Sequence, residues 1–170
     1  MKIIAHRGNL NGPNPLTEND PKRITQCIED GYDVEIDVWY MDGDWFVGHD
    51  EPLYRIELEF LKQKGLWCHA KNIESLYELI QISDEINCFW HQTDDVTLTS
   101  FGFLWTYPGK NLTPKSIAVL PEKKKFKNIK FNGGGDGCDP TVNNNHTDAF
   151  SNKKEKWDKN LLEELSNIRP

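Results

Sequence analysis

The order of the expected elements predicts an α/β fold built around a parallel sheet. Short apolar runs with strand-like alternation recur along the chain, and helical patterns with capping residues lie between several of them. This alternation of strand and helix is typical of sheets whose strands run parallel. The chain has 170 residues, which is enough for one domain with a sizeable core.

The first two elements are a strand and a helix. Residues 2–5, apolar from Ile3 on, predict a short buried strand that leads into His6. Asp20 is expected to cap the next helix, with Pro21 in its first turn. Gly31 is expected to end that helix.

The second strand is predicted over residues 32–40. Its alternation places Val34, Ile36 and Val38 on one face, and Glu35 and Asp37 on the other. A tight turn is predicted directly after this strand, at residues 42–43, and it leads into a third strand. This piece of the chain is therefore expected to form a hairpin.

The middle of the chain continues the alternation. A helix is predicted over residues 55–64, ended by Gly65, and a strand over residues 66–69. Asn72 is expected to cap the next helix. The apolar positions of that helix are Ile73, Leu76, Leu79 and Ile80. Further strands are predicted at residues 86–90, 103–106 and 117–120.

The pattern weakens after Pro121. Residues 133–145 are rich in Gly, Asn and Asp and read as a loop, whereas residues 153–168 predict an amphipathic helix. We therefore divide the chain into a domain of residues 1–130 and a tail of residues 131–170 that packs on the same domain.

Charge and composition narrow the classes of partner. The net charge of −7 argues against a nucleic-acid partner, which needs concentrated Lys and Arg. No apolar run reaches the roughly 18 residues of a membrane span, so no stable membrane anchor is expected. The cysteines form no C-x-x-C pair, which favours reduced thiols and a cytoplasmic protein. Composition does not indicate the oligomeric state.

Polar side chains gather where the predicted strands end. The set consists of His6, Glu35, Asp37, His49, His69 and Lys71. Residues at the carboxyl ends of parallel strands in a barrel converge on one site. Paired carboxylates bind divalent cations, and histidines act as acids and bases near neutral pH. His91, after a later strand, fits either the same pocket or a loop.

Each of these residues also has a purely structural interpretation. A histidine at a strand end is often only hydrogen-bonded, and a Glu-x-Asp pair often lies on a solvated face. The residues alone leave both readings open.

Five fragments together resemble the glycerophosphodiester phosphodiesterase family. They are Ile4-Ala5-His6-Arg7-Gly8, Glu18-Asn19, Gly31-Tyr32-Asp33-Val34-Glu35-Ile36-Asp37-Val38, Asp42-Gly43 and Val47-Gly48-His49-Asp50. The resemblance covers residues 1–52 and implies a TIM-barrel-like parallel barrel. Because such a barrel typically takes about 250 residues, we expect a short barrel that is incomplete at its C-terminal end.

The resemblance also implies roles for the residues. His6 and His49 match the catalytic histidines, and Glu35 and Asp37 match two metal ligands. The substrate-binding residues would be Arg7 and Lys71. His69 stands where the family has a third carboxylate ligand, so we expect it to be the third ligand of one divalent ion: Mg, Ca, Mn or Zn.

The function that this implies is metal-dependent hydrolysis of a small glycerophosphodiester-like substrate by two-histidine acid–base catalysis. Two alternatives stay open. One is a catalytically inactive barrel that binds a phosphoester or a protein partner, which the His69 replacement favours. The other is a lyase that stops at a cyclic phosphate.

Overall fold

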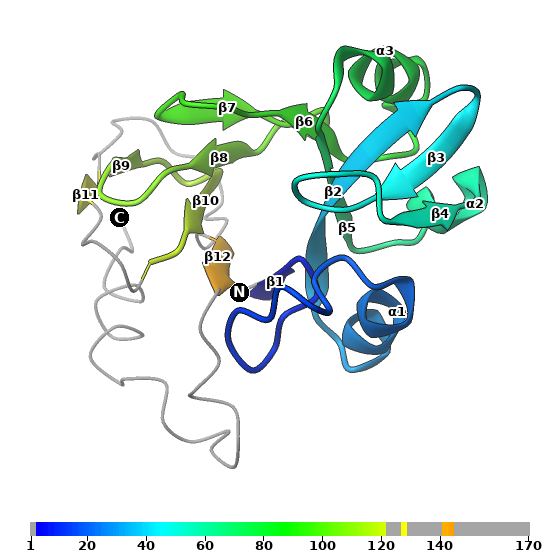
Figure 1. Cartoon of the computed structure of the whole chain (residues 1–170). Coiled ribbons are helices and arrows are strands. Elements are labelled where there is room, and N and C mark those ends of the chain that lie inside the picture. The colour runs from blue at the N-terminus through cyan, green and yellow to red at the C-terminus, as the bar shows by residue number, and fades with distance from the viewer. Residues whose placement is uncertain (1–2, 122–126, 129–140, 145–170) are drawn as a thin grey trace.

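A computed structural model describes residues 3–121, 127–128 and 141–144 (Figure 1). Ten strands form one sheet: β1 (Ile3–His6), β2 (Asp33–Met41), β3 (Asp44–Val47), β4 (Tyr54–Ile56), β5 (Leu66–Ala70), β6 (Cys88–Trp90), β7 (Val96–Leu98), β8 (Leu104–Thr106), β10 (Ser116–Val119) and β12 (Thr141–Asn144). A separate pair consists of β9 (Asn111–Leu112) and β11 (Lys127–Asn128). The helices are α1 (Pro21–Glu29), α2 (Leu58–Leu61) and α3 (Ile73–Gln81).

The large sheet has a parallel centre and antiparallel flanks. Its central order is β6-β5-β2-β1-β12-β10-β8, and every neighbouring pair in this run is parallel. β3 and β4 continue from the carboxyl half of β2 as an antiparallel meander, and β7 is antiparallel to β8. The three helices gather around the β2 and β5 half of the molecule, as Figure 1 shows.

The expected TIM-barrel-like fold is wrong. The described chain is mostly β-sheet with three short helices, and it forms no closed barrel, because β6 pairs only with β5 and β7 only with β8. A parallel crossover helix needs a connection of about a dozen residues. Only residues 42–43 join β2 to β3, and residues 107–115 between parallel β8 and β10 contain β9 and no helix.

The first helix and the second strand form as predicted. The Asp20 side chain accepts a hydrogen bond from the Lys22 amide at 2.9 Å, and α1 buries Ile24 against the sheet. Gly31, with φ of 90°, ends the helix in the left-handed region that glycine adopts without strain. The predicted alternation of β2 and its hairpin with β3 are also confirmed.

Two predictions in the middle of the chain need correction. The helix predicted from residue 55 begins instead at Leu58, because residues 54–56 pair with β3 and bury Ile56. In α3 the cap at Asn72 is confirmed, but Ile73 and Ile80 are exposed on the outer side of the helix.

The glycine- and asparagine-rich region contains a strand that the sequence pattern did not predict. Residues 141–144, predicted as loop, form β12 between β1 and β10. The predicted helix over residues 153–168 lies outside the described residues. No helix in the described part of the chain is long and apolar enough to cross a membrane.

The apolar core is split between the two faces of the sheet. One cluster lies under α1 and α3 and includes Val34, Ile36 and Val38. The other lies on the face that also carries Glu35 and Asp37. Its members are Ile4, Trp67, Phe89, Trp105, Ile117 and Val119. This second cluster forms an apolar floor below the polar ends of β1, β2 and β5. Cys27, Cys68 and Cys88 are buried free thiols.

Candidate metal centre

Strand register brings the polar side chains together. His6 on β1 lies opposite Glu35 on β2, and Asp37 lies opposite His69 on β5. Partners across a parallel ladder lie roughly 4.8 Å apart, and residues two apart on a strand share a face. The first, second and fifth strands therefore present four ionisable side chains on one face, at neighbouring positions.

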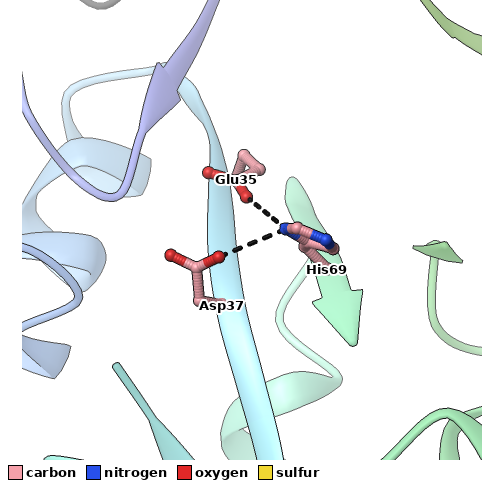
Figure 2. A group of neighbouring side chains, drawn as sticks. All are labelled: Glu35, Asp37 and His69. Carbon is pink, nitrogen blue, oxygen red and sulfur yellow. Dashed lines mark ion pairs between the residues drawn. The ribbon is translucent and has the colours of Figure 1, made fainter. Parts of the chain in front are cut away.

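Glu35, Asp37 and His69 form a set of possible metal ligands. One oxygen or nitrogen of each lies within 4.8 Å of the others. His69 Nδ1 is 3.2 Å from Asp37 Oδ1 and 3.6 Å from Glu35 Oε1, and Figure 2 shows the three side chains pointing toward one another. Two carboxylates and one imidazole are a common donor set for a divalent cation.

The ring of His69 is fixed by contacts on its far side. Its Nε2 lies 2.8 Å from the carbonyl oxygen of His91, so Nε2 carries the hydrogen and donates it. The ring also stacks on Phe89, with centroids 5.1 Å apart and planes 4° apart. Nδ1 is thereby turned toward the two carboxylates. A backbone carbonyl that fixes the ring of a histidine ligand is typical of metal sites.

The ion pairs of the cluster shift the pKa of its members. Burial would lower the pKa of His69, but Asp37 and Glu35 outweigh it and raise the pKa to about 9. Burial would likewise raise the pKa of Asp37, but His69, Lys71 and Arg7 hold it well below its usual range. Asp37 is therefore a carboxylate at neutral pH.

Two carboxylate oxygens in the cluster lack a hydrogen bond. Glu35 and Asp37 are only 2% and 1% exposed, and Glu35 Oε2 and Asp37 Oδ1 are buried without a hydrogen-bonding partner. Leaving a buried charged acceptor without a hydrogen bond costs free energy. Among the described residues, Glu35 Oε2 has only His6 nearby, at 3.6 Å, and Asp37 Oδ1 has only ion pairs with His69 and Lys71. A divalent cation held by Glu35, Asp37 and His69 would add positive charge beside both buried carboxylates, so the residues present fit a metal ion.

Asn19 holds Asp37 in place. Its side-chain amide donates to Asp37 Oδ2 at 3.0 Å, and its side-chain oxygen accepts from the Asp37 amide at 2.9 Å. Asn19 is fully buried and has φ of 60°, a left-handed conformation that asparagine tolerates better than most residues. The sequence predicted no role for Asn19. The only sequence signal was the fragment Glu18-Asn19 itself.

The two predicted substrate-binding cations lie beside Asp37. Arg7 Nε is 3.1 Å from Asp37 Oδ2, and Lys71 Nζ is 3.3 Å from Asp37 Oδ1. Arg7 Nη1 also donates to Glu18 Oε2 at 2.9 Å. Both cations therefore border the carboxylate set, where they can attract a phosphate group.

The two predicted catalytic histidines differ in their surroundings. His6 is largely buried, and its Nε2 lies 3.6 Å from Glu35 Oε2. Burial lowers the pKa of His6, and this effect outweighs the nearby Glu35 carboxylate, which raises it. The ring of His6 is therefore neutral at neutral pH. A neutral imidazole can accept a proton.

His49 is brought next to the site but not into it. Its Nδ1 pairs with the exposed Asp50 at 2.7 Å, and among the described residues it forms no ion pair with Glu35 or Asp37. The preceding Gly48 amide donates to the Asp37 carbonyl at 3.1 Å. The loop that carries His49 is thus attached to the backbone of β2 beside the cluster.

Comparison with known proteins adds no relative. No protein-family model matches the chain, and no curated protein or solved structure is similar enough to count as a match.

Proposed function

We propose that the chain is a metal-dependent phosphoric diester hydrolase that acts on glycerophosphodiester-like substrates. The observation that carries the proposal is the cluster of Glu35, Asp37 and His69, in which one buried oxygen of each carboxylate lacks a hydrogen bond. The motif resemblance in residues 1–52 supports a phosphodiester as the substrate. The comparisons neither support nor oppose it.

The proposal gives each residue of the site a task. Glu35, Asp37 and His69 Nδ1 hold the cation, which when bound neutralises phosphate charge as a Lewis acid. Arg7 and Lys71 attract and orient the non-bridging phosphate oxygens.

Two proton transfers complete the proposed reaction. His6, neutral and beside Glu35, accepts the proton of the attacking oxygen as its bond to phosphorus forms. That oxygen comes from water or from a neighbouring hydroxyl of the substrate, and in the second case water then opens the cyclic phosphate to a phosphomonoester. His49 is the proposed donor to the leaving alkoxide, and its loop would turn the ring from Asp50 toward the substrate.

The test is a metal-dependent assay with bis-nitrophenyl phosphate and glycerophosphocholine. We expect the chelator-treated protein to be inactive and a divalent ion to restore turnover. Glu35→Gln and Asp37→Asn should abolish that restoration, and His6→Ala and His49→Ala should each lower turnover by about 10²–10⁴-fold. The matched control is Glu29→Gln, an exposed glutamate on α1.

The proposal fails if chelator-treated protein or the two carboxylate variants keep full turnover. Product analysis separates the reaction types, because a lyase would release a cyclic phosphate and a hydrolase a phosphomonoester.

A second candidate is a phosphoester-binding protein without activity. The pairing of His49 with Asp50, away from the cluster, favours it. On that view glycerophosphocholine binds in the presence of metal but is not turned over, and isothermal titration with product analysis distinguishes the two candidates.

A further inference from the structure

A groove lies between the start of α3 and the end of β2, separate from the candidate metal centre. Its volume is about 710 Å³, and it is lined by residues 39–42, 72–74 and 77–78. None of the residues at the metal centre lines it. A volume of this size falls within the range of binding pockets in proteins.

The α3 side of the groove carries large apolar side chains that face solvent. Ile73 is 65% exposed and Tyr77, one turn later, is 61% exposed. Ile80, half exposed, extends the same row. Met41 at the end of β2 adds an exposed apolar side chain on the opposite wall. This row spans about 10 Å along the helix, at its rise of about 1.5 Å per residue.

The charged residues of the groove are all acidic. Asp42 lies on the β2 wall, and Glu74 and Glu78 lie one turn apart on α3. Among the described residues, none of these three carboxylates forms an ion pair. A partner that covers the apolar row would therefore bind better if it carried positive charges at its edges, next to these carboxylates.

The two walls are joined by side-chain to backbone hydrogen bonds. Asn72 Nδ2 donates to the Tyr40 carbonyl at 2.8 Å, and the Tyr40 amide donates to Asn72 Oδ1 at 3.2 Å. Asn72 and Ser75 also form a capping box that fixes the start of α3. The groove is thus formed before any partner arrives, which lowers the entropic cost of binding.

We propose that this groove binds an amphipathic helix of a partner protein whose apolar face is flanked by lysine or arginine. Amphipathic helices commonly dock by laying their apolar face into an apolar groove, and the exposed apolar row of α3 would pack against that face. The three unpaired carboxylates select a basic partner and oppose nucleic acids and anionic membranes. A small organic cation would leave the row beyond Tyr77 uncovered.

The test uses two synthetic amphipathic peptides of sixteen residues on the full chain. Both peptides have the same leucine residues on one helical face. All remaining positions are lysine in one peptide and glutamate in the other. We expect the lysine peptide to shift the amide NMR signals of residues 39–42 and 72–78, and to bind at least about tenfold more tightly than the glutamate peptide. Raising salt from about 0.05 M to about 0.5 M should reduce that difference.

Matched variants separate the groove from general charge attraction. The double variant Glu74→Gln, Glu78→Gln should weaken the lysine peptide about tenfold. The double variant Glu29→Gln, Glu51→Gln removes the same charge from exposed positions elsewhere and should not. Tyr77→Ala should abolish binding, whereas Leu98→Ala, at an equally exposed apolar residue on β7, should leave it unchanged.

Equal binding of both peptides, or signal shifts away from the groove, would overturn the proposal. So would groove signals that move with protein concentration alone, because the occupant would then be a second copy of this chain. Failure of the metal-dependent assay leaves this proposal untouched, since the two sites share no residue.

Discussion

Asp37 lies between four groups that donate hydrogen bonds or carry positive charge. Arg7 and Asn19 contact its Oδ2, and His69 and Lys71 lie near its Oδ1. Oδ2 is thus held by a hydrogen bond and an ion pair, whereas Oδ1 has two ion pairs and no hydrogen bond. Asn19 is the neutral member of the four, so its removal tests positioning without changing the charge.

Asn19→Ala is expected to lower the free energy of unfolding by about 1.5–3 kcal/mol, because hydrogen bonds to a buried charged group are lost. It should also weaken divalent-ion binding, since Asp37 can then turn. Chemical denaturation and titration calorimetry measure the two effects.

The control is Asn19→Gly, which loses the same bonds but adopts the left-handed backbone without strain. It should weaken metal binding as much as Asn19→Ala does. It should lower the free energy of unfolding by roughly 1 kcal/mol less than Asn19→Ala, because glycine avoids the backbone strain. Unchanged metal affinity in both variants would mean that Asn19 does not position Asp37.

His69 gives the candidate centre a nitrogen donor. Imidazole suits Zn, Fe and Ni, whereas carboxylate oxygen suits Mg, Ca and Mn. We expect His69→Glu to shift the metal preference toward Mg or Ca, as measured by activity or binding curves over a series of divalent ions. His91→Gln keeps the backbone carbonyl that holds His69 and serves as the control. Identical curves for wild type and His69→Glu would show that His69 is not a ligand.

The loop after β3 depends on one glycine. A Cβ atom on Gly48 would lie 2.1 Å from the Glu51 carbonyl oxygen and 2.9 Å from the Leu53 amide nitrogen. Gly48→Ala must therefore move the backbone that carries His49. We expect a loss of stability of about 1–3 kcal/mol, typical of overpacking, and a loss of activity larger than that of an exposed Gly43→Ala control. Melting curves and turnover check this, and a wild-type value for both would contradict it.

Local signals made some elements predictable. Asp20, Pro21 and Gly31 mark α1 by capping and turn chemistry, which depend on adjacent residues alone. The strict alternation of β2 placed Glu35 and Asp37 on one face, so the carboxylate pair could be predicted from the sequence. The position of the carboxylate pair in the candidate metal centre therefore follows from the strand period.

Other elements depend on distant parts of the chain. Residues 54–56 are a strand because β3 lies beside them, and residues 141–144 are a strand because β1 and β10 flank them. The contribution of His91 comes from its backbone carbonyl, which no side-chain pattern can reveal. The barrel prediction failed for the same reason, since closure depends on strand pairings that a sequence motif does not specify.

At the scale of the whole molecule, β12 joins the two halves of the sheet. Val142 is paired with Ile3 on one side and Ala118 on the other. Val142→Pro removes a backbone donor from a central strand, and the loss of a ladder hydrogen bond is expected to cost about 1–3 kcal/mol. Urea denaturation should show a lower midpoint than for the wild type. An unchanged midpoint for the proline variant would mean that β12 contributes little to stability.

The position of β12 in the sheet also has a consequence for synthesis on the ribosome. Its partners, β1 and β10, both precede it in the chain, and until residue 144 emerges each of them has an open edge. Unpaired strand edges are sites of intermolecular association. A nascent chain of this protein therefore passes through an interval in which it is prone to aggregate, and chaperone binding during translation should be concentrated before β12 emerges.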